Sequence, residues 1–247
     1  MTDIKVSIFG TWARPKDWPG FFESVSSNSI SYEIVIAGPN RPLYTLPPNV
    51  RFIHVTPDPG PAPCGQIAAN HCRGETIMLA ADDTRYSPHA LDYAYLTYKK
   101  ENDYRCMVHF RWGTSVENDL TDKNLHLFLT PNPNFRYGFT LWSKQFFKEL
   151  GGYDKKFTAG PGDADIQLRA YARGGRYVYS YSSFVIEDTT LVPGGWYQGA
   201  YFQRDGYGQI QNLLWKRWYE GEPPNITLRS EPTTPFEPFE NLGEYNV

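Results

Sequence analysis

The stretch GETIMLAADDT, residues 74–84, carries the fold signal from which the rest of the sequence can be interpreted. Its mainly apolar part, residues 76–80, is a short continuous run of the kind that forms a strand buried on both faces. Two adjacent carboxylates, Asp82 and Asp83, follow that run directly. Ligands of open α/β sheets gather at the carboxyl ends of strands. The stretch therefore predicts a buried strand with candidate functional acids just past its end.

Similar runs recur on both sides of this stretch, separated by segments of helical pattern. Continuous runs that alternate with helices favour an α/β fold with a mostly parallel, Rossmann-like central sheet covered by helices on both faces. We expect strands at 5–9, 32–37, 50–55, 76–80, 107–112, 135–141 and 177–182. We expect helices at 18–27, 64–73, 88–101, 143–150 and 163–173.

The length of 247 residues suits one α/β domain with a C-terminal appendage. We expect the domain at 1–222, built from two halves at 1–100 and 101–222. Residues 223–247 are rich in Pro and acidic side chains and show no hydrophobic period. They predict an irregular tail that lies over the domain or is partly mobile.

Composition excludes several classes of protein. The net charge of −3, with both signs evenly mixed, argues against a surface that coats nucleic acid in general. The three cysteines form no C-x-x-C pair and are odd in number, so neither a disulfide framework nor a zinc knuckle is indicated. No apolar run of 18 residues occurs in the sequence. We therefore expect a soluble cytoplasmic protein.

Several blocks, in this order, resemble glycosyltransferase family 2 and its relatives with the GT-A fold. They are SIFGTWARP (7–15), YEIVI (32–36), GETIMLAADD (74–83), FFKELGGYD (146–154) and GDADIQLR (162–169). They are similar to the family's first strand and turn, its second strand, its acidic block, and its Gly-Gly turn with the acidic helix start that follows. Together they fall within residues 5–180, nearly three quarters of the chain. The ordered set is far more specific than any single block.

The resemblance implies a GT-A fold in which 1–100 binds a nucleotide-sugar donor and 101–222 binds the acceptor. It implies metal-dependent, inverting transfer of a hexose or pentose from that donor to an acceptor hydroxyl. Asp83 matches the last acid of the family's Asp-x-Asp motif and would coordinate Mn²⁺ or Mg²⁺. Asp82 would contact the donor ribose or help to hold the metal. Without this context, the pair would read as an ordinary turn and helix start.

Other matched positions complete the expected site. Asp163 corresponds to the family's general base, which deprotonates the acceptor. Asp165 stands in the first helical turn, where either catalysis or a favourable interaction with the helix dipole explains a carboxylate. Thr11 and Arg14 correspond to positions near the nucleotide. Arg14 is suited to pairing with a phosphate, and a surface salt bridge is the alternative.

The sequence departs from the family pattern at points that affect specificity. The segment at 37–40, Ala-Gly-Pro-Asn, replaces the acid pair that recognises the base, so the donor base stays open. All five His residues precede residue 127, and the late His that completes the family's metal site is missing. Asp188, or its neighbour Glu187, is the candidate replacement as an oxygen ligand. Leu214 stands where processive members have the Gln of Gln-x-x-Arg-Trp, so polymer synthesis is not expected.

The acceptor side is expected in the later half of the chain. Trp196 and Tyr197 are candidates for stacking on an acceptor. The stretch 213–219 interleaves basic and aromatic residues and is explained either by acceptor binding or by an amphipathic helix packed on the core. A glycan or small-molecule acceptor is favoured, and a modified DNA base is a further option. Two alternatives from other classes are a nucleotidyltransferase of similar fold and a non-catalytic carbohydrate-binding protein.

Overall fold

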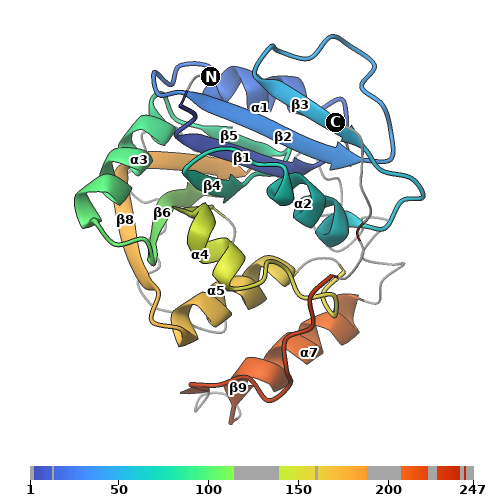
Figure 1. The fold of residues 1–247 in the computed structure, drawn as a ribbon, viewed down its shortest axis with the longest axis vertical. Helices are drawn as coiled ribbons and strands as arrows, with labels where there is room; N and C mark the ends of the chain where they lie inside the picture. The colour runs from blue at the N-terminus through green and yellow to red at the C-terminus, as the bar shows by residue number, and fades with distance from the viewer. Residues whose placement is uncertain are drawn as a thin grey trace.

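The computed structural model describes residues 3–12, 14–113, 139–158, 161–187, 207–221, 227–239 and 242. These residues build an eight-stranded sheet with helices on both faces (Figure 1). Its strands are β1 (Val6–Thr11), β2 (Tyr32–Gly38), β3 (Val50–His54), β4 (Thr76–Leu79), β5 (Thr84–Tyr86), β6 (Cys106–Gly113), β7 (Thr140–Ser143) and β8 (Arg176–Glu187). The helices are α1 (Trp18–Val25), α2 (Pro61–Asn70), α3 (Ala90–Glu101), α4 (Lys144–Glu149), α5 (Gly162–Ala172) and α7 (Tyr207–Trp218). A separate two-stranded sheet pairs β9 (Tyr219–Glu220) with β10 (Thr227–Leu228).

The strand order is β3-β2-β1-β4-β7-β6-β8-β5. The first four strands are parallel, and β7 runs antiparallel to both of its neighbours. From β1 the chain moves outward through β2 and β3, and then returns to place β4 on the other side of β1. The sheet therefore has a topological switch point between β1 and β4, the place where ligands bind in open α/β sheets.

Side chains that alternate in direction along the central strands explain why the core has two parts, one on each face of the sheet. In β1, Ile8 belongs to the hydrophobic cluster on one face and Phe9 to the cluster on the other, because successive side chains of a strand point in opposite directions. Helices α1 and α3 contribute to the first cluster, and α2, α4 and α5 to the second. Both faces of the sheet are thus covered, as the continuous apolar runs predict.

Helix α7 packs against α5 through a third, smaller cluster that includes Leu168, Leu214 and Trp218. In Figure 1 it lies at the opposite end of the molecule from β3. Buried Leu214 and Trp218 confirm that the stretch 213–219 is largely an amphipathic helix packed on the core. In the part of the chain that the structure describes, no helix has the length and apolar content that a membrane crossing requires.

Most of the expected helices and strands are present with small shifts at their ends, and three differ more. Helix α2 starts at Pro61, three residues early, since proline is well suited to the first turn of a helix. Strand β8 continues to Glu187 after a β-bulge. The strand expected at 135–141 is β7, Thr140–Ser143, and residues 135–138 lie outside the described ranges.

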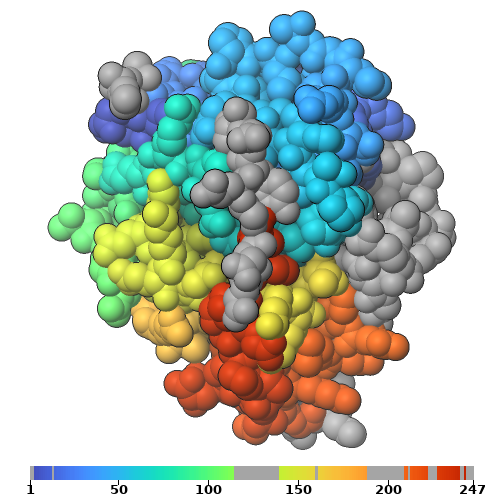
Figure 2. All heavy atoms as spheres, turned by 45° about the vertical axis from the view of Figure 1, so that its right-hand side comes forward, coloured from blue at the N-terminus to red at the C-terminus, as the bar shows by residue number. Residues whose placement is uncertain are grey.

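The described C-terminal residues lie on the surface of the domain, where Figure 2 shows them in red beside the yellow 150–158 region. The backbone N–H of Lys155 donates to the carbonyl of Glu237 at 2.9 Å. The ring of Phe236 lies 4.4 Å from the guanidinium carbon of Arg169. The segment 227–239 therefore has specific contacts with the domain that it follows.

Two glycines near the switch point give a matched stability test. A Cβ at Gly10 would lie 2.7 Å from Trp18 Cη2 and 2.8 Å from the Ala80 carbonyl oxygen, so Gly10→Ala forces α1 away from the sheet. We expect Gly10→Ala to lower the free energy of unfolding by about 2–3 kcal/mol.

The control is Gly65 in the interior of α2, where an added Cβ would be 3.5 Å from its nearest neighbour, an ordinary contact. Gly65→Ala should raise the free energy of unfolding by up to about 1 kcal/mol, because alanine favours the helix. Urea unfolding measures both. Equal stability of the two variants would contradict this account of Gly10.

Candidate active site

The loops that leave β1 and β4 meet at the switch point through an ion-paired cluster. Arg14 follows β1, and Asp82 and Asp83 follow β4. Arg14 Nε donates to Asp82 Oδ2 at 3.1 Å, and Arg14 Nη2 donates to Asp82 Oδ1. The same Nη2 donates to Asp83 Oδ2 at 2.8 Å. Three predicted donor-site residues are thus brought together, and Arg14 makes its ion pairs with the acids themselves.

Both carboxylates are buried, with Asp82 3% and Asp83 2% exposed. Desolvation raises the pKa of Asp82 to about 6, and its bonds to Arg14 offset only part of that effect. The neighbouring charges of Asp83 and Asp17 raise the pKa further. Burial and the neighbouring acids therefore disfavour the ionised form of Asp82 more than Arg14 favours it.

Asp17, which the sequence analysis did not single out, is a third acid at this cluster. It occupies the N-cap position of α1 but its side chain makes no capping bond. Instead its Oδ2 lies 3.9 Å from Arg14 Nε, and the residue is 7% exposed. The signal for it was weak, since Asp just before a helix normally indicates a cap.

Asp83 has the property expected of a ligand to a cation. Its Oδ1 is buried and has no hydrogen-bond partner among the described residues. A buried, unpaired carboxylate oxygen is costly unless something binds to it. Carboxylate oxygen is also the donor type that Mg²⁺ and Mn²⁺ prefer.

The cluster does not form a complete metal cage. Within the described ranges, no group of three or more His, Cys, Asp and Glu side chains could hold a metal ion. Mg²⁺ is commonly bound by one or two carboxylates together with substrate phosphates and water, so Asp82 and Asp83 fit that kind of site. Asp188 lies outside the described residues. Glu187 is buried, and sheet pairing sets it opposite Thr84, next to Asp83.

Thr11 lies at the end of β1 and donates from Oγ1 to the Pro61 carbonyl at 2.9 Å, which ties the strand to the start of α2. A Cβ added at Gly65 would lie 3.9 Å from the same Oγ1 and 3.5 Å from the ring of Tyr153, so both lie near this point of α2. Tyr153 in turn lines a hollow with Asp163. These contacts connect the β1 loop with the second acidic block.

Asp163 stands at the start of α5 and faces a narrow hollow. Leu79, the last residue of β4, lines the same hollow, so Asp163 lies near the edge of the sheet that carries Asp82. The other lining residues are Thr140, Trp142, Tyr153, Ile166 and Gln167. Desolvation raises the pKa of Asp163 to about 7, although its Oδ1 accepts a bond from the Ala164 N–H. A carboxyl with a pKa near neutrality is suited to general base chemistry.

Asp165, two residues further on, lies in a buried ion network. Its Oδ2 accepts from Arg169 Nε at 2.8 Å, and its Oδ1 accepts from Trp218 Nε1 at 2.9 Å. Arg217 Nη1 lies 3.1 Å from the same Oδ1 and 2.7 Å from Asp154 Oδ2. Both oxygens of Asp165 have partners: Oδ2 pairs with Arg169 within α5, and the partners of Oδ1 connect α5 with α7. This geometry supports a structural role for Asp165, although by an ion network rather than by the helix dipole alone.

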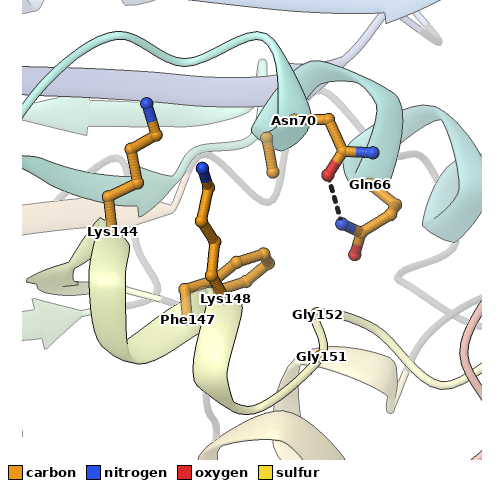
Figure 3. A pocket seen from close by; sticks show the side chains of 8 residues that line it. Gln66, Asn70, Lys144, Phe147, Lys148, Gly151 and Gly152 are labelled. Carbon is orange, nitrogen blue, oxygen red and sulfur yellow. Dashed lines mark hydrogen bonds between the residues drawn. The ribbon is translucent and has the colours of Figure 1, made fainter.

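The acceptor candidates Trp196 and Tyr197 lie outside the described residues. A second hollow, of about 140 Å³, is bordered by α2 and α4 (Figure 3). Gln66 and Asn70 of α2 are hydrogen-bonded to each other at 2.8 Å there, opposite Lys144, Phe147 and Lys148 of α4. None of the residues predicted for the site lines this hollow, and it is larger than the one beside Asp163.

Replacing Asp165 by asparagine and replacing Asp163 by asparagine should affect the stability of the fold differently. We expect Asp165→Asn to lower the free energy of unfolding by about 3 kcal/mol or more, because buried Arg169 loses its carboxylate partner and Arg217 keeps only Asp154. Urea unfolding at pH 7.5 measures the loss. A loss below about 1 kcal/mol would contradict the structural role.

Asp163→Asn should instead gain stability over the wild type as pH rises. The folded-state pKa lies above the ordinary value of 3.8, so the folded protein binds more protons than the unfolded chain between about pH 4 and 7. The wild type therefore loses stability through this window, whereas the asparagine variant, which cannot ionise, does not. We expect a relative gain of about 4 kcal/mol from pH 4 to 8, measured by urea unfolding. A difference independent of pH would contradict the raised pKa.

Comparison with known proteins identifies the fold. No protein-family model and no curated protein matches the sequence. The structure of S. aureus TarS 1–349 superposes with a TM-score of 0.61 at 11% identity, over 75% of this chain and 61% of that one. The same fragment in complex with UDP-GlcNAc gives 0.57 at 10% identity, over 74% and 59%. For S. aureus TarS itself the values are 0.56 and 11%, over 71% and 35%.

This chain therefore corresponds to less than two thirds of the length of each TarS structure. The similarity is one of fold, a mixed α/β sheet with flanking helices. The protein has the GT-A fold, as the sequence predicts.

Proposed function

We propose that this protein is a glycosyltransferase that moves a hexosyl or pentosyl group from a nucleotide-sugar donor to an acceptor hydroxyl. The observation that carries the proposal is the cluster of Arg14, Asp82 and Asp83 at the switch point of a GT-A fold. TarS 1–349, of similar fold, has been solved with UDP and with UDP-GlcNAc, which supports a nucleotide sugar as the donor.

The donor diphosphate would lie against the loops after β1 and β4. Asp83, through its unpaired Oδ1, and Asp82 would hold Mn²⁺ or Mg²⁺ there. The bound cation would neutralise the negative charge that develops on the leaving diphosphate. Thr11 and Arg14 would bind the donor from the β1 side, with the guanidinium suited to a phosphate oxygen.

Asp163 would act as the general base. It lines a hollow with Leu79 at the end of β4, and its pKa of about 7 lets it be ionised yet basic near neutral pH. As a base it would take the proton from the acceptor hydroxyl, which then attacks the anomeric carbon in one displacement and inverts it. We favour a glycan or small-molecule acceptor.

Donor binding can be tested by thermal unfolding with UDP-, GDP-, dTDP- and CMP-sugars, each with and without Mn²⁺. A ligand that binds only the folded state stabilises it, by about 2.7 kcal/mol at a ligand concentration of 100 times Kd, and this raises the apparent Tm. We expect one base to stabilise the wild type in the presence of Mn²⁺, and Asp83→Asn to lose most of that stabilisation. An equal Tm shift in Asp83→Asn would exclude its metal role, and no shift with any donor would contradict the proposed function.

The pH dependence of donor turnover tests Asp163. Because the base must be ionised, we expect kcat/KM to fall about tenfold per pH unit below pH 7 and to level off above it. Asp163→Asn should lower kcat by about 10²–10⁴ and remove this acidic limb, while the donor-induced Tm shift persists. An acidic limb that persists unchanged in the variant would assign it to another group.

A further inference from the structure

We propose that Arg14 is an exchangeable counter-ion, which neutralises Asp82 and Asp83 when no donor is bound and moves to the donor's diphosphate when a divalent cation takes its place. The inference rests on the proposed function and adds an order of events to it. It makes cation binding and diphosphate binding depend on each other through one side chain.

The position of the guanidinium is the first argument. Arg14 Nη2 bonds to one oxygen of Asp82 and to one oxygen of Asp83, so a single nitrogen bridges the two carboxylates. A cation held by Asp83 Oδ1 and by Asp82 would need an oxygen of Asp82, and Arg14 bonds to both of those oxygens. Arg14 and the cation therefore compete directly for the pair, and a cation arriving alone must first displace the guanidinium.

The charge of the cluster is the second argument. Asp17, Asp82 and Asp83 are all buried, and every ion pair that the structure gives them is with Arg14. Removing the guanidinium leaves these acids without that compensation in a poorly solvated site, which is costly. Arg14 is thus held on the acids until a divalent cation replaces its charge. A diphosphate that attracts Arg14 then favours cation binding, and the cation favours diphosphate binding.

The third argument is that the guanidinium can leave without disturbing the core. The Arg14 side chain is 32% exposed, whereas those of Asp82 and Asp83 are 4% and 2% exposed. The Arg14 carbonyl accepts from the Asp17 N–H at 3.1 Å, so the turn is held by its backbone. A rotation of the side chain towards solvent therefore moves the charge while the loop keeps its position.

The test measures Mn²⁺ binding itself, by titration calorimetry, for the wild type and Arg14→Met without nucleotide and then with UDP or GDP. Without nucleotide, we expect Arg14→Met to bind Mn²⁺ about 10-fold more tightly, because its competitor is gone. With Mn²⁺ present, we expect the variant to bind the nucleoside diphosphate about 10-fold more weakly. In the wild type, each ligand should tighten the other by a larger factor than in the variant.

Arg73→Met is the matched control. Arg73 also pairs with a buried acid, Glu33, which keeps Arg51 as a second partner, so its loss should leave Mn²⁺ binding unchanged. Arg14→Lys keeps a charge without the bridging fork and should resemble the wild type in Mn²⁺ affinity more than Arg14→Met does. Circular dichroism confirms that each variant is folded.

The outcomes separate the two proposals. Unchanged or weaker Mn²⁺ binding by folded Arg14→Met, with nucleoside diphosphate binding retained, overturns the exchange and leaves the proposed function standing. No Mn²⁺ binding by any variant, even with UDP or GDP, overturns the metal-dependent function and the exchange with it. Opposite changes in the two affinities in Arg14→Met alone support the exchange.

Discussion

Parallel pairing of β1 with β4 is the constraint on which the site depends. The last residues that pair between these two strands are Phe9 and Leu79, so the segments that follow β1 and β4 lie at the same edge of the sheet. Arg14 and Asp82, which are 68 residues apart in sequence, become hydrogen-bonded partners for this reason. Gly10 lets Trp18 of α1 and the Ala80 carbonyl approach the same point of β1, which fixes both loops against the sheet. The ion-paired cluster therefore depends on the order of the strands in the sheet more than on the local sequence around each residue.

Local features such as the central strands could be predicted from the sequence, whereas contacts between residues far apart in the sequence could not. Apolar runs located the central strands, because burial on both faces demands continuous apolar residues. Strand β5 has only three residues, and its pairing with the end of β8 has no local signal. Burial of Asp17 beside Arg14 was equally invisible, since Asp before a helix indicates a cap. The partners of Asp165 were partly foreseeable, because Arg169 follows at the i+4 spacing of a helical ion pair, but Arg217 and Trp218 come from another helix.

The start of α5 shows how environment separates two acids of the same type. Asp163 and Asp165 are both in the first helical turn, and the helix dipole favours a carboxylate at either position. Asp165 is enclosed by two arginines and an indole N–H, which stabilise its charge, and it is fully buried, away from any substrate in solution. Asp163 lacks an arginine partner among the described residues, faces a hollow and has a raised pKa. The family resemblance places both residues in one acidic block. Only their contacts in the structure distinguish Asp165, which holds the helices together, from Asp163, the candidate base.

Charge balance also distinguishes the ion network between α5 and α7 from the ion-paired cluster at the switch point. The network between α5 and α7 contains two carboxylates, Asp154 and Asp165, and two guanidinium groups, Arg169 and Arg217, so its formal charge is neutral without any ligand. At the switch point, three buried carboxylates share the single guanidinium of Arg14, and Asp83 keeps an oxygen without a hydrogen bond among the described residues. Since buried charge is costly unless compensated, the network between α5 and α7 is balanced by its own residues, whereas the cluster at the switch point has an excess of carboxylates among the described residues, which supports the proposed cation. That imbalance is the physical reason to propose a binding site at the loops of β1 and β4 and a structural role for the network between the helices.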